Sequence, residues 1–502
     1  MSAEFILTVD QGTSGTKAVV FDSSGAVVAK ATESLTSYFP QPGYVEQDPI
    51  EIYDNALAAV KACLKKFTEV TSPCLDAIAA CGISNQRETF VVWDESGRPL
   101  CNAIVWQCKR SIDICDRLKD TELESQIKQR TGLIVDPYFS GTKLLWLREN
   151  DPRVAEAIRT GKALFGTVDT WLLHRLTAGR SYLTDHTNAS RTLLFNIDQL
   201  DWDGDLLAEY GLAGLRLPEA KPSSADYGMT DFDGLLPRPI PVSAMIGDSH
   251  AAAFGERCFS PGTAKATMGT GCSILLNTGQ KRVASKAGMV TTICWSTADR
   301  VDYALEGIIV TCGATINWLR DSMGLFADSH QTEEMALAVS DNAGVYLVPA
   351  FSGLGAPHWH MDLRAAILGL TFGCDKNHVV RAALESIPYQ IKDVIVAMEK
   401  DSGVPLQQLQ IDGGITANQF VVQFLADLLD TEVATIGMPD VSALGAALLA
   451  GLQCGMFEDT DQLGRLDMAK HTYVPGPGAE TTDASYEGWK NAVDRLVAPR
   501  LQ

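Results

Sequence analysis

Two short glycine turns, each set between apolar strands, constrain the fold of this chain more than any other feature. In the first, the strand FILTVD leads into Gly12-Thr13-Ser14-Gly15 and then into the strand TKAVVFD. In the second, GTAKATM leads into Gly269-Thr270-Gly271 and then into CSILLNTG. Each unit also has an acid at a strand end, Asp10 in one and Asp248 in the other. We interpret the repeat as an internal duplication of one β-rich unit.

The sequence around the turns predicts an α/β fold. A helical segment from about Asp48 to Lys66 follows the first hairpin, and the strands IAACGIS and FVVWD then flank the loop NQRET. Alternation of this kind predicts domains with a layered sheet, which we divide into residues 1–252 and 253–502. With 502 residues, 46% of them hydrophobic, the chain can bury two cores.

Charge and composition exclude several classes of protein. The 41 Lys and Arg residues are outnumbered by 62 Asp and Glu residues, a net charge of −21, which argues against a nucleic-acid or anionic-membrane partner. The uncharged stretch between Asp440 and Glu458 is rich in Ala and Gly, so we interpret it as a tightly packed buried helix and expect no membrane insertion. We expect a cytoplasmic protein whose 12 Cys are free thiols. The seven-residue spacing of Cys101, Cys108 and Cys115 is a weak zinc pattern, since Cys101 lies in an extended stretch.

The first glycine turn has the composition of a phosphate site. Glycines such as Gly15 allow main-chain N–H groups to point at one cluster of oxygens, while Thr13, Ser14 and Lys17 add hydroxyl donors and a positive charge. Asp10, at the end of the preceding strand, is a candidate Mg²⁺ ligand. The alternative is an ordinary polar β-turn.

A third stretch, LQIDGGITANQF, strengthens the phosphate hypothesis. A strand ends at Asp412-Gly413-Gly414, and Asn418 opens the helix that follows. A glycine pair at such a turn lets a ligand approach the backbone, and helix N-termini favour anions. Neither a P-loop nor a G-x-G-x-x-G follows any strand. We therefore predict that a nucleotide binds between two hairpin-bearing domains.

The acceptor of a phosphoryl group needs a base and polar contacts. Asp248 is a candidate general base at a strand tip, although a helix N-cap is its alternative role. The stretch Gly247-Asp248-Ser249-His250-Ala251 is also close to the nucleophile turn of serine hydrolases. Arg87-Glu88 offers donors and an acceptor to a polyol, against a surface ion pair as the alternative, and Trp106 is either a carbon-packing wall or core.

Longer stretches carry a family resemblance. Among them are DQGTSGTKAVVFD, GISNQRETFVVWD, NAIVWQCKR, TDHTNASRTLLFNI, YALEG and VPAFSGLGAPHW, together with the signature stretches YFSGTKLLWLREN and AILGLTFGCDKNHVVRAALE. From Phe5 to about Trp489 the chain resembles the glycerol kinase branch of the FGGY carbohydrate kinases, in the actin/hexokinase/Hsp70-like superfamily.

The resemblance implies two ribonuclease-H-like domains of the actin-like ATPase type, with ATP, Mg²⁺ and a small polyol bound in the cleft between them. It implies ATP-dependent phosphorylation of glycerol to sn-glycerol 3-phosphate, and we expect a homo-oligomer, either a dimer or a tetramer. By position, its first phosphate contacts are Thr13, Ser14, Gly15 and Lys17. Its nucleotide contacts are Thr270, Gly313, Gly414, Asn418 and Asn317, the last where a Gln is usual. Its substrate pocket is Arg87, Glu88, Trp106, Tyr138 and Asp248, with Asp248 as the catalytic base.

Two positions depart from the family pattern. Ser249 stands where the family has a Gln that donates to a glycerol hydroxyl, and Ser273 stands where it has a Phe that packs on the glycerol carbons. Both serines are expected to face the polyol, and they predict a larger, wetter pocket. A kinase for erythritol, threitol or a similar polyol is therefore an alternative to a glycerol kinase. A non-catalytic actin-like relative is a further alternative, which the acceptor residues Arg87, Glu88 and Tyr138 disfavour.

Overall fold

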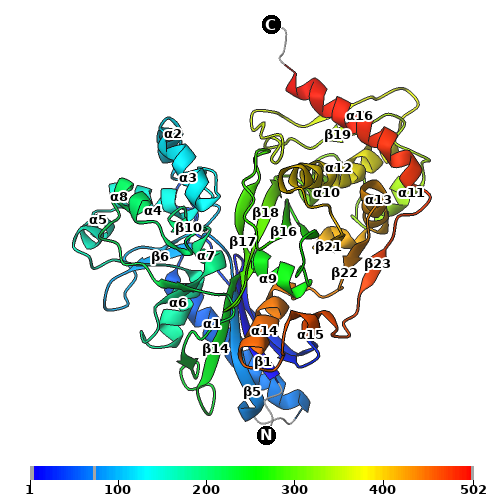
Figure 1. The fold of residues 1–502 in the computed structure, drawn as a ribbon. Helices are drawn as coiled ribbons and strands as arrows, with labels where there is room; N and C mark the ends of the chain where they lie inside the picture. The colour runs from blue at the N-terminus through cyan, green and yellow to red at the C-terminus, as the bar shows by residue number, and fades with distance from the viewer. Residues whose placement is uncertain (1–4, 72–74, 499–502) are drawn as a thin grey trace.

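Two large mixed sheets form the centres of two lobes (Figure 1). The computed structural model describes residues 5–71 and 75–498. The first sheet has the order β13-β14-β5-β1-β2-β3 and the second the order β17-β18-β16-β15-β21-β22-β23. The strands of the first sheet are β1 (Phe5–Gly12), β2 (Gly15–Asp22), β3 (Val27–Ser34), β5 (Ile78–Asn85), β13 (Met229–Thr230) and β14 (Ile240–Gly247). Those of the second are β15 (Thr263–Met268), β16 (Cys272–Gly279), β17 (Val290–Ser296), β18 (Val301–Ile309), β21 (Gln408–Asp412), β22 (Val433–Thr435) and β23 (His471–Tyr473).

The two sheets share one topology. Strands β1, β2 and β3 form an antiparallel meander, β5 lies parallel to β1, and β14 lies parallel to β5. In the second lobe β15, β16 and β18 form the meander, β21 lies parallel to β15, and β22 lies parallel to β21. The glycine turns predicted from the sequence join β1 to β2 and β15 to β16. The predicted duplication is confirmed for the two hairpins, which place the two turns at corresponding points of the two sheets. The assignment of Asp248 to the second unit is wrong, because the strand that precedes it, β14, pairs with β5 in the first sheet.

Helices cover the sheets of both lobes (Figure 1). The helices that matter most for the site are α1 (Pro49–Thr71), α9 (Asp248–Gly255), α10 (Gly313–Asp321), α12 (Lys376–Ser402), α13 (Gln419–Leu429) and α14 (Val441–Gln453). The others are α2 (Ile112–Lys119), α3 (Leu123–Thr131), α4 (Ser140–Asn150), α5 (Pro152–Arg159), α6 (Val168–Leu176), α7 (His186–Ala189), α8 (Gly204–Glu209), α11 (Gln331–Leu337), α15 (Thr460–Gly464) and α16 (Ala479–Val497). Helix α1 packs on β2 and β3, whereas α12 packs on β16 and β18.

Helix α14 packs on the first lobe, and its close packing there accounts for its high content of Ala and Gly. It packs against α9, β1, β5 and β14, as its position beside the blue strands in Figure 1 shows. A Cβ atom on Gly445 would lie 1.8 Å from the main-chain oxygen of Ala251, and one on Gly82 would lie 2.4 Å from that of Ala446. Only glycine permits such close approaches. The buried helix predicted between Asp440 and Glu458 is confirmed, although it packs on the first sheet rather than within residues 253–502 alone.

Smaller elements complete the fold. The stretch FVVWD contributes β6 (Phe90–Trp93), which lies outside the first large sheet, in a four-stranded sheet with β4 (Glu46–Gln47), β7 (Ala103–Ile104) and β8 (Leu164–Thr167). Short strand pairs are β9 (Leu183–Asp185) with β12 (Glu219–Lys221), β10 (Phe195–Asn196) with β11 (Asp201–Trp202), and β19 (Tyr346–Val348) with β20 (Ala366–Leu368).

The described residues also bear on the remaining sequence predictions. Their cysteines are free, as predicted, and Cys74 lies outside them. Within residues 5–71 and 75–498, no group of three or more His, Cys, Asp or Glu side chains is arranged to hold a metal ion. Over the same ranges, no helix has both the length and the apolar character needed to cross a membrane.

Candidate active site

A cavity of about 700 Å³ opens between the two sheets and is lined by all of the predicted acceptor residues. Its walls include Thr13, Arg87, Glu88, Trp106, Tyr138, Asp248, Ser249, Lys265, Thr267, Ser273, Asp412, Gly413, Gly414 and Ser442. Every predicted substrate-binding residue is therefore on this wall. We call Arg87, Glu88, Trp106, Tyr138 and Asp248 together the acceptor wall.

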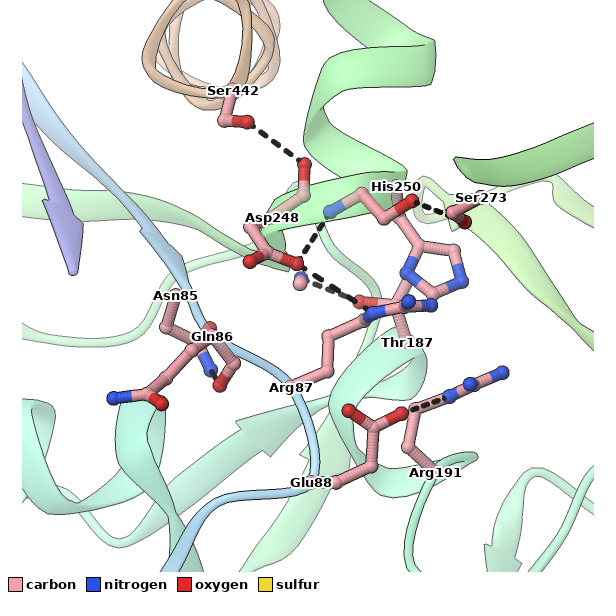
Figure 2. A network of polar contacts seen from close by, with 12 residues as sticks. Asn85, Gln86, Arg87, Glu88, Thr187, Arg191, Asp248, His250, Ser273 and Ser442 are labelled. Atoms are coloured by element: carbon pink, nitrogen blue, oxygen red, sulfur yellow. Dashed lines mark hydrogen bonds and ion pairs between the residues drawn. The ribbon is translucent and has the colours of Figure 1, made fainter. Parts of the chain in front are cut away.

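Asp248 is the first residue of α9, directly after β14 ends. Its Oδ1 accepts a hydrogen bond from the main-chain N–H of Ser249 at 2.6 Å, and its main-chain oxygen accepts one from the Ser442 hydroxyl on α14 at 3.0 Å (Figure 2). The preceding Gly247 donates to the Thr187 hydroxyl, and a Cβ there would lie 2.7 Å from Cγ of Arg87. The carboxylate is thus fixed at the strand tip that the sequence predicted.

The surroundings of Asp248 favour its use as a base. Its side chain is 39% accessible, but the access is to the cavity, and desolvation by the surrounding protein raises its pKa. Nε of Arg87, 3.6 Å away, opposes part of that rise, while the charge of Asp10 adds to it. A carboxylate with a raised pKa binds a proton more readily, as a general base must.

Arg87 and Glu88 do not form a surface ion pair with each other. Both are buried in the loop between β5 and β6, and each pairs with a residue distant in sequence (Figure 2). Arg87 donates to Glu306 Oε1 at 2.8 Å, and Arg191 donates to Glu88 Oε1 at 2.6 Å. Arg191 also lies 2.6 Å from the second oxygen of Glu306. Burial alone raises the pKa of Glu306, but the charges of Arg191 and Arg87 outweigh burial and hold it well below its usual range.

Two aromatic side chains close the acceptor wall. The rings of Trp106 and Tyr138 meet edge to face with centroids 5.5 Å apart, and Trp106 Nε1 donates to Thr13 Oγ1 at 2.9 Å. Beneath them the buried Lys143 donates to the main-chain oxygens of Trp106 and Tyr138, at 3.3 and 2.7 Å. Burial lowers the pKa of Lys143 to about 8. Trp106 is therefore a wall of the cavity and not a core residue.

Of the two unusual serines, Ser273 lines the cavity from β16 of the second lobe, and Ser249 follows Asp248 on α9 of the first lobe. Ser273 donates to Glu306 Oε1 at 3.1 Å and lies 3.5 Å from the Ser249 hydroxyl. Lys265, on β15, donates to Ser249 at 2.9 Å and to Thr267 Oγ1 at 2.6 Å. We call Lys265, Ser249 and Ser273 the serine row. Within the described residues, the Ser249 hydroxyl hydrogen-bonds to these partners and to no His or acid, so the serine-hydrolase alternative lacks its triad.

A second, smaller cavity of about 280 Å³ lies beside the first on the other side of the glycine turns. It is lined by all five predicted nucleotide contacts, Thr270, Gly313, Asn317, Gly414 and Asn418. Gly414 lines both cavities. Asn418 caps α13 by accepting from Val421 N at 3.1 Å, and a Cβ on Gly313 would lie 2.7 Å from the main-chain oxygen of Gly269. Here main-chain groups at turns and a helix N-terminus supply the polar contacts, the arrangement suited to phosphates.

The first hairpin completes the cleft. Thr13 lines the large cavity, whereas Ser14 and Gly15 belong to the turn itself, where a Cβ on Gly15 would lie 2.5 Å from the Glu33 main-chain oxygen. Lys17 extends from β2 to Asp440 Oδ1 at 3.1 Å. Its predicted phosphate contact is not made in this arrangement and stays a prediction.

The surroundings of Asp10 show whether its carboxylate suits a magnesium ion. Its carboxylate accepts a hydrogen bond from Ser84, and burial raises its pKa. A neighbouring cation is the ordinary way to compensate such a desolvated carboxylate. Because Mg²⁺ needs only one or two protein carboxylates when phosphates supply the other ligands, the residues present fit it.

Sequence reasoning missed several side chains of the site. Glu306, Arg191, Lys143 and Lys265 received no role, although YALEG and TDHTNASRT were among the stretches that carry the resemblance. For Lys265 a signal was available. It alternates with Thr267 along β15, so both side chains point to one face of the sheet.

Comparisons with known proteins agree with the fold and with the cleft. Residues 5–255 match the N-terminal domain of the FGGY family of carbohydrate kinases, and residues 264–454 match its C-terminal domain. The chain is 46% identical over 495 residues to a glycerol kinase of Desulfitobacterium hafniense, covering 98% of this chain and 99% of that protein. It is 47% identical over 503 residues to one of Brevibacillus brevis, covering 100% of both.

Solved structures show the same similarity in three dimensions. A glycerol kinase of Plasmodium falciparum with ADP superposes with a TM-score of 0.93 at 35% identity, over 99% of each chain. A gluconate kinase of Lactobacillus acidophilus superposes with a TM-score of 0.88 at 23% identity, over 98% of each chain, which shows the shared fold.

Proposed function

The chain belongs to the FGGY family of carbohydrate kinases, and we propose that it is an ATP-dependent glycerol kinase that forms sn-glycerol 3-phosphate. The observation that carries the proposal is the position of Asp248. Asp248 lines one cavity together with the other residues of the acceptor wall and with the glycine turn at Gly413 and Gly414. Relatives that match the whole chain at 46% to 47% identity and are glycerol kinases support the choice of acceptor.

In the proposed reaction, Arg87 and Glu88 hydrogen-bond to two hydroxyls of glycerol, and the third hydroxyl donates a hydrogen bond to the Asp248 carboxylate. Arg87 donates to an oxygen, Glu88 accepts from a hydroxyl, and the rings of Trp106 and Tyr138 contact the carbon chain. As the terminal oxygen attacks the γ-phosphoryl group, its proton passes to the Asp248 carboxylate. The ionic network behind Arg87 and Glu88 keeps both side chains in place during the transfer.

The nucleotide occupies the glycine side. In the proposal, main-chain N–H groups at Thr270 and Gly414 donate to phosphate oxygens, and Asn317 and Asn418 line the same cavity. Asp10 would hold Mg²⁺, which when bound neutralises charge on the transferring phosphates. We extend the proposal to a cytoplasmic homo-oligomer, for which light scattering of the purified protein is the test.

A coupled assay tests the function directly. The full chain is incubated with ATP, Mg²⁺ and glycerol, and ADP release is followed together with oxidation of the product by an enzyme that accepts only sn-glycerol 3-phosphate. We expect equal amounts of ADP and of this product. ADP release that does not depend on glycerol would point to an ATPase of the actin-like type and contradict the proposal.

A further inference from the structure

The serine row is a set of hydrogen-bonding groups that glycerol does not need. Glycerol has three hydroxyls, and Asp248, Arg87 and Glu88 are enough to bind them. Lys265 and Ser273 line the same cavity from the second lobe, Ser249 lines it from α9 of the first lobe, and none of them belongs to the acceptor wall. Their polar atoms face a space that a three-carbon polyol leaves to water.

The two serines of the row keep hydrogen-bonding capacity for a ligand. Ser249 Oγ accepts from Lys265 and lies 3.5 Å from Ser273 Oγ, longer than the usual O–H···O distance of about 2.5–3.0 Å, so the Ser249 proton is available to a closer acceptor. Ser273 gives its own proton to Glu306 and keeps its lone pairs for another partner. An oxygen placed between the two serines would accept from Ser249 and donate to Ser273. A hydroxyl group does both, and a carboxylate only accepts.

The charge balance around the row also selects a neutral ligand. The cations on or directly behind these walls are Arg87, Arg191 and Lys265, and the carboxylates are Glu88, Asp248, Glu306 and Asp412. Three positive and four negative charges leave no surplus positive charge for an acidic sugar. Lys265 forms no ion pair within the described residues, and its ammonium group donates to hydroxyl oxygens.

From these contacts we propose that Ser249, Ser273 and Lys265 form a subsite for a fourth hydroxyl, so that the acceptors include linear four-carbon polyols, the tetritols, as well as glycerol. The proposal rests on the kinase activity proposed above. In the subsite Ser249 donates to the extra hydroxyl, Ser273 accepts its proton, and Lys265 fixes the orientation of the Ser249 hydroxyl. The base, Asp248, serves both classes of acceptor.

The test compares acceptors in the ADP-release assay with the full chain. The panel contains glycerol, erythritol, D- and L-threitol, butane-1,2,4-triol and erythronate. Butanetriol has the four carbons without the fourth hydroxyl, and erythronate has a carboxylate at one end. One added carbon typically changes kcat/KM by about 10–200-fold in a pocket that does not fit it. Because we propose that this pocket has room for the fourth carbon, we expect kcat/KM for at least one tetritol to lie within about tenfold of that for glycerol. We expect butanetriol to be at least fivefold poorer than the better tetritol.

Variants then separate the contribution of the serine hydroxyls from that of the free volume beside them. In the double variant Ser249→Ala, Ser273→Ala, the tetritol-to-glycerol ratio of kcat/KM should fall about tenfold, which corresponds to about 1.4 kcal/mol of lost hydrogen bonding. The variant Ser273→Thr keeps the hydroxyl and should keep the tetritol activity, whereas Ser273→Phe fills the space and should abolish it. Ser442→Ala is the matched control, because this cavity serine already donates to the main chain of Asp248, and the ratio should not change.

Each possible result decides between the hypotheses. Turnover of glycerol without any turnover of tetritols overturns the subsite and leaves the glycerol kinase intact. An unchanged ratio in the double Ala variant also overturns it, and a preference for erythronate shows an anion site instead of a hydroxyl site. No turnover of any polyol contradicts the proposed function itself. Melting curves with and without ATP establish that each variant is folded and binds nucleotide.

Discussion

On the acceptor side of the cleft the groups that face the cavity are side chains held by other side chains, whereas on the nucleotide side they are main-chain groups at glycine turns. Arg87 and Glu88 depend on Glu306 and Arg191, all of them buried. At Gly414, by contrast, a Cβ atom would meet nothing within 4 Å. The difference suits the ligands. A neutral polyol offers a few directional hydroxyls, and a nucleotide offers charged phosphates that many N–H groups can share.

The comparison predicts that single side-chain changes are most damaging on the acceptor side. In Asp248→Asn an amide replaces the proposed base, so we expect kcat to fall about 10²–10⁴-fold while ATP still binds. Turnover numbers and the ATP-dependent shift in melting temperature measure the two effects. A variant with near-normal turnover would show that Asp248 serves only as the first residue of α9.

Asp10 is expected to show a smaller and different effect. In Asp10→Ala the Mg²⁺ concentration for half-maximal activity should rise about 10–100-fold, the usual cost of weakening a metal's surroundings, while KM for glycerol changes little. Asp22→Ala is the matched control. Asp22 ends the neighbouring strand β2, and its carboxylate serves only the turn to Ala26. Equal magnesium curves for both variants would show that Asp10 is a turn residue as well.

The pH dependence follows from the raised pKa of Asp248. Burial places this pKa above the ordinary value of about 3.9, and the reaction needs the deprotonated form. We therefore expect kcat/KM to decline about tenfold per pH unit below the raised pKa, with the decline beginning above pH 4. A rate that stays constant down to pH 4 in a protein that remains folded would exclude Asp248 as a base with a raised pKa.

On the nucleotide side, replacing a glycine hydrogen by a methyl group should be enough to weaken ATP binding. Gly414→Ala has room for its Cβ, so stability should not change, but the methyl group would keep a phosphate off the backbone. Losing one charge-assisted hydrogen bond costs about 1.5–3 kcal/mol, so KM for ATP should rise about tenfold or more. Gly204→Ala, at the exposed start of α8 and equally free of contacts, is the control. If both variants keep the normal KM, phosphates do not approach Gly414.

The same difference explains what could be predicted from the sequence. Turns such as Gly269-Thr270-Gly271 are local, so their composition alone points to a phosphate site, and Asp248 is visible as an acid at a strand end. The acceptor network is not local. Arg87 and Glu306 are 219 positions apart, and their pairing depends on the register of β18 against β16, where Glu306 lies opposite Leu275. The paired charges of Arg87 and Glu88 in a loop suggested a polyol contact and the family resemblance supported it, but geometry was needed for Glu306.

The last prediction concerns Glu256, a buried carboxyl group near Asp412 and Lys265 to which the sequence analysis gave no role. We expect its substitution to have the smallest effect. Glu256, just after α9, is buried, and neither of its carboxyl oxygens accepts a hydrogen bond within the described residues. Burial and then the charge of Asp412 raise the pKa of Glu256 well above its usual range, and the charge of Lys265 only partly opposes them. On the acceptor side, by comparison, the buried carboxylates of Glu88 and Glu306 are paired with arginines. We infer that Glu256 is protonated in the folded protein and donates to Asp412.

The variant Glu256→Gln sharpens the comparison, because an amide is a permanent version of that neutral donor. A carboxyl group whose pKa is higher folded than unfolded weakens the fold as pH rises above the unfolded value of about 4.3. The melting temperature of Glu256→Gln should therefore equal that of the unmodified chain near pH 4 and exceed it increasingly toward pH 8. Glu209→Gln, at the exposed end of α8, should show no such trend. If Glu256→Gln is instead the less stable protein at pH 8, then Glu256 is ionised and paired with Lys265. Glu256 would then be a paired buried carboxylate, as Glu88 and Glu306 are on the acceptor side. Lys265 would in that case be less free to orient Ser249.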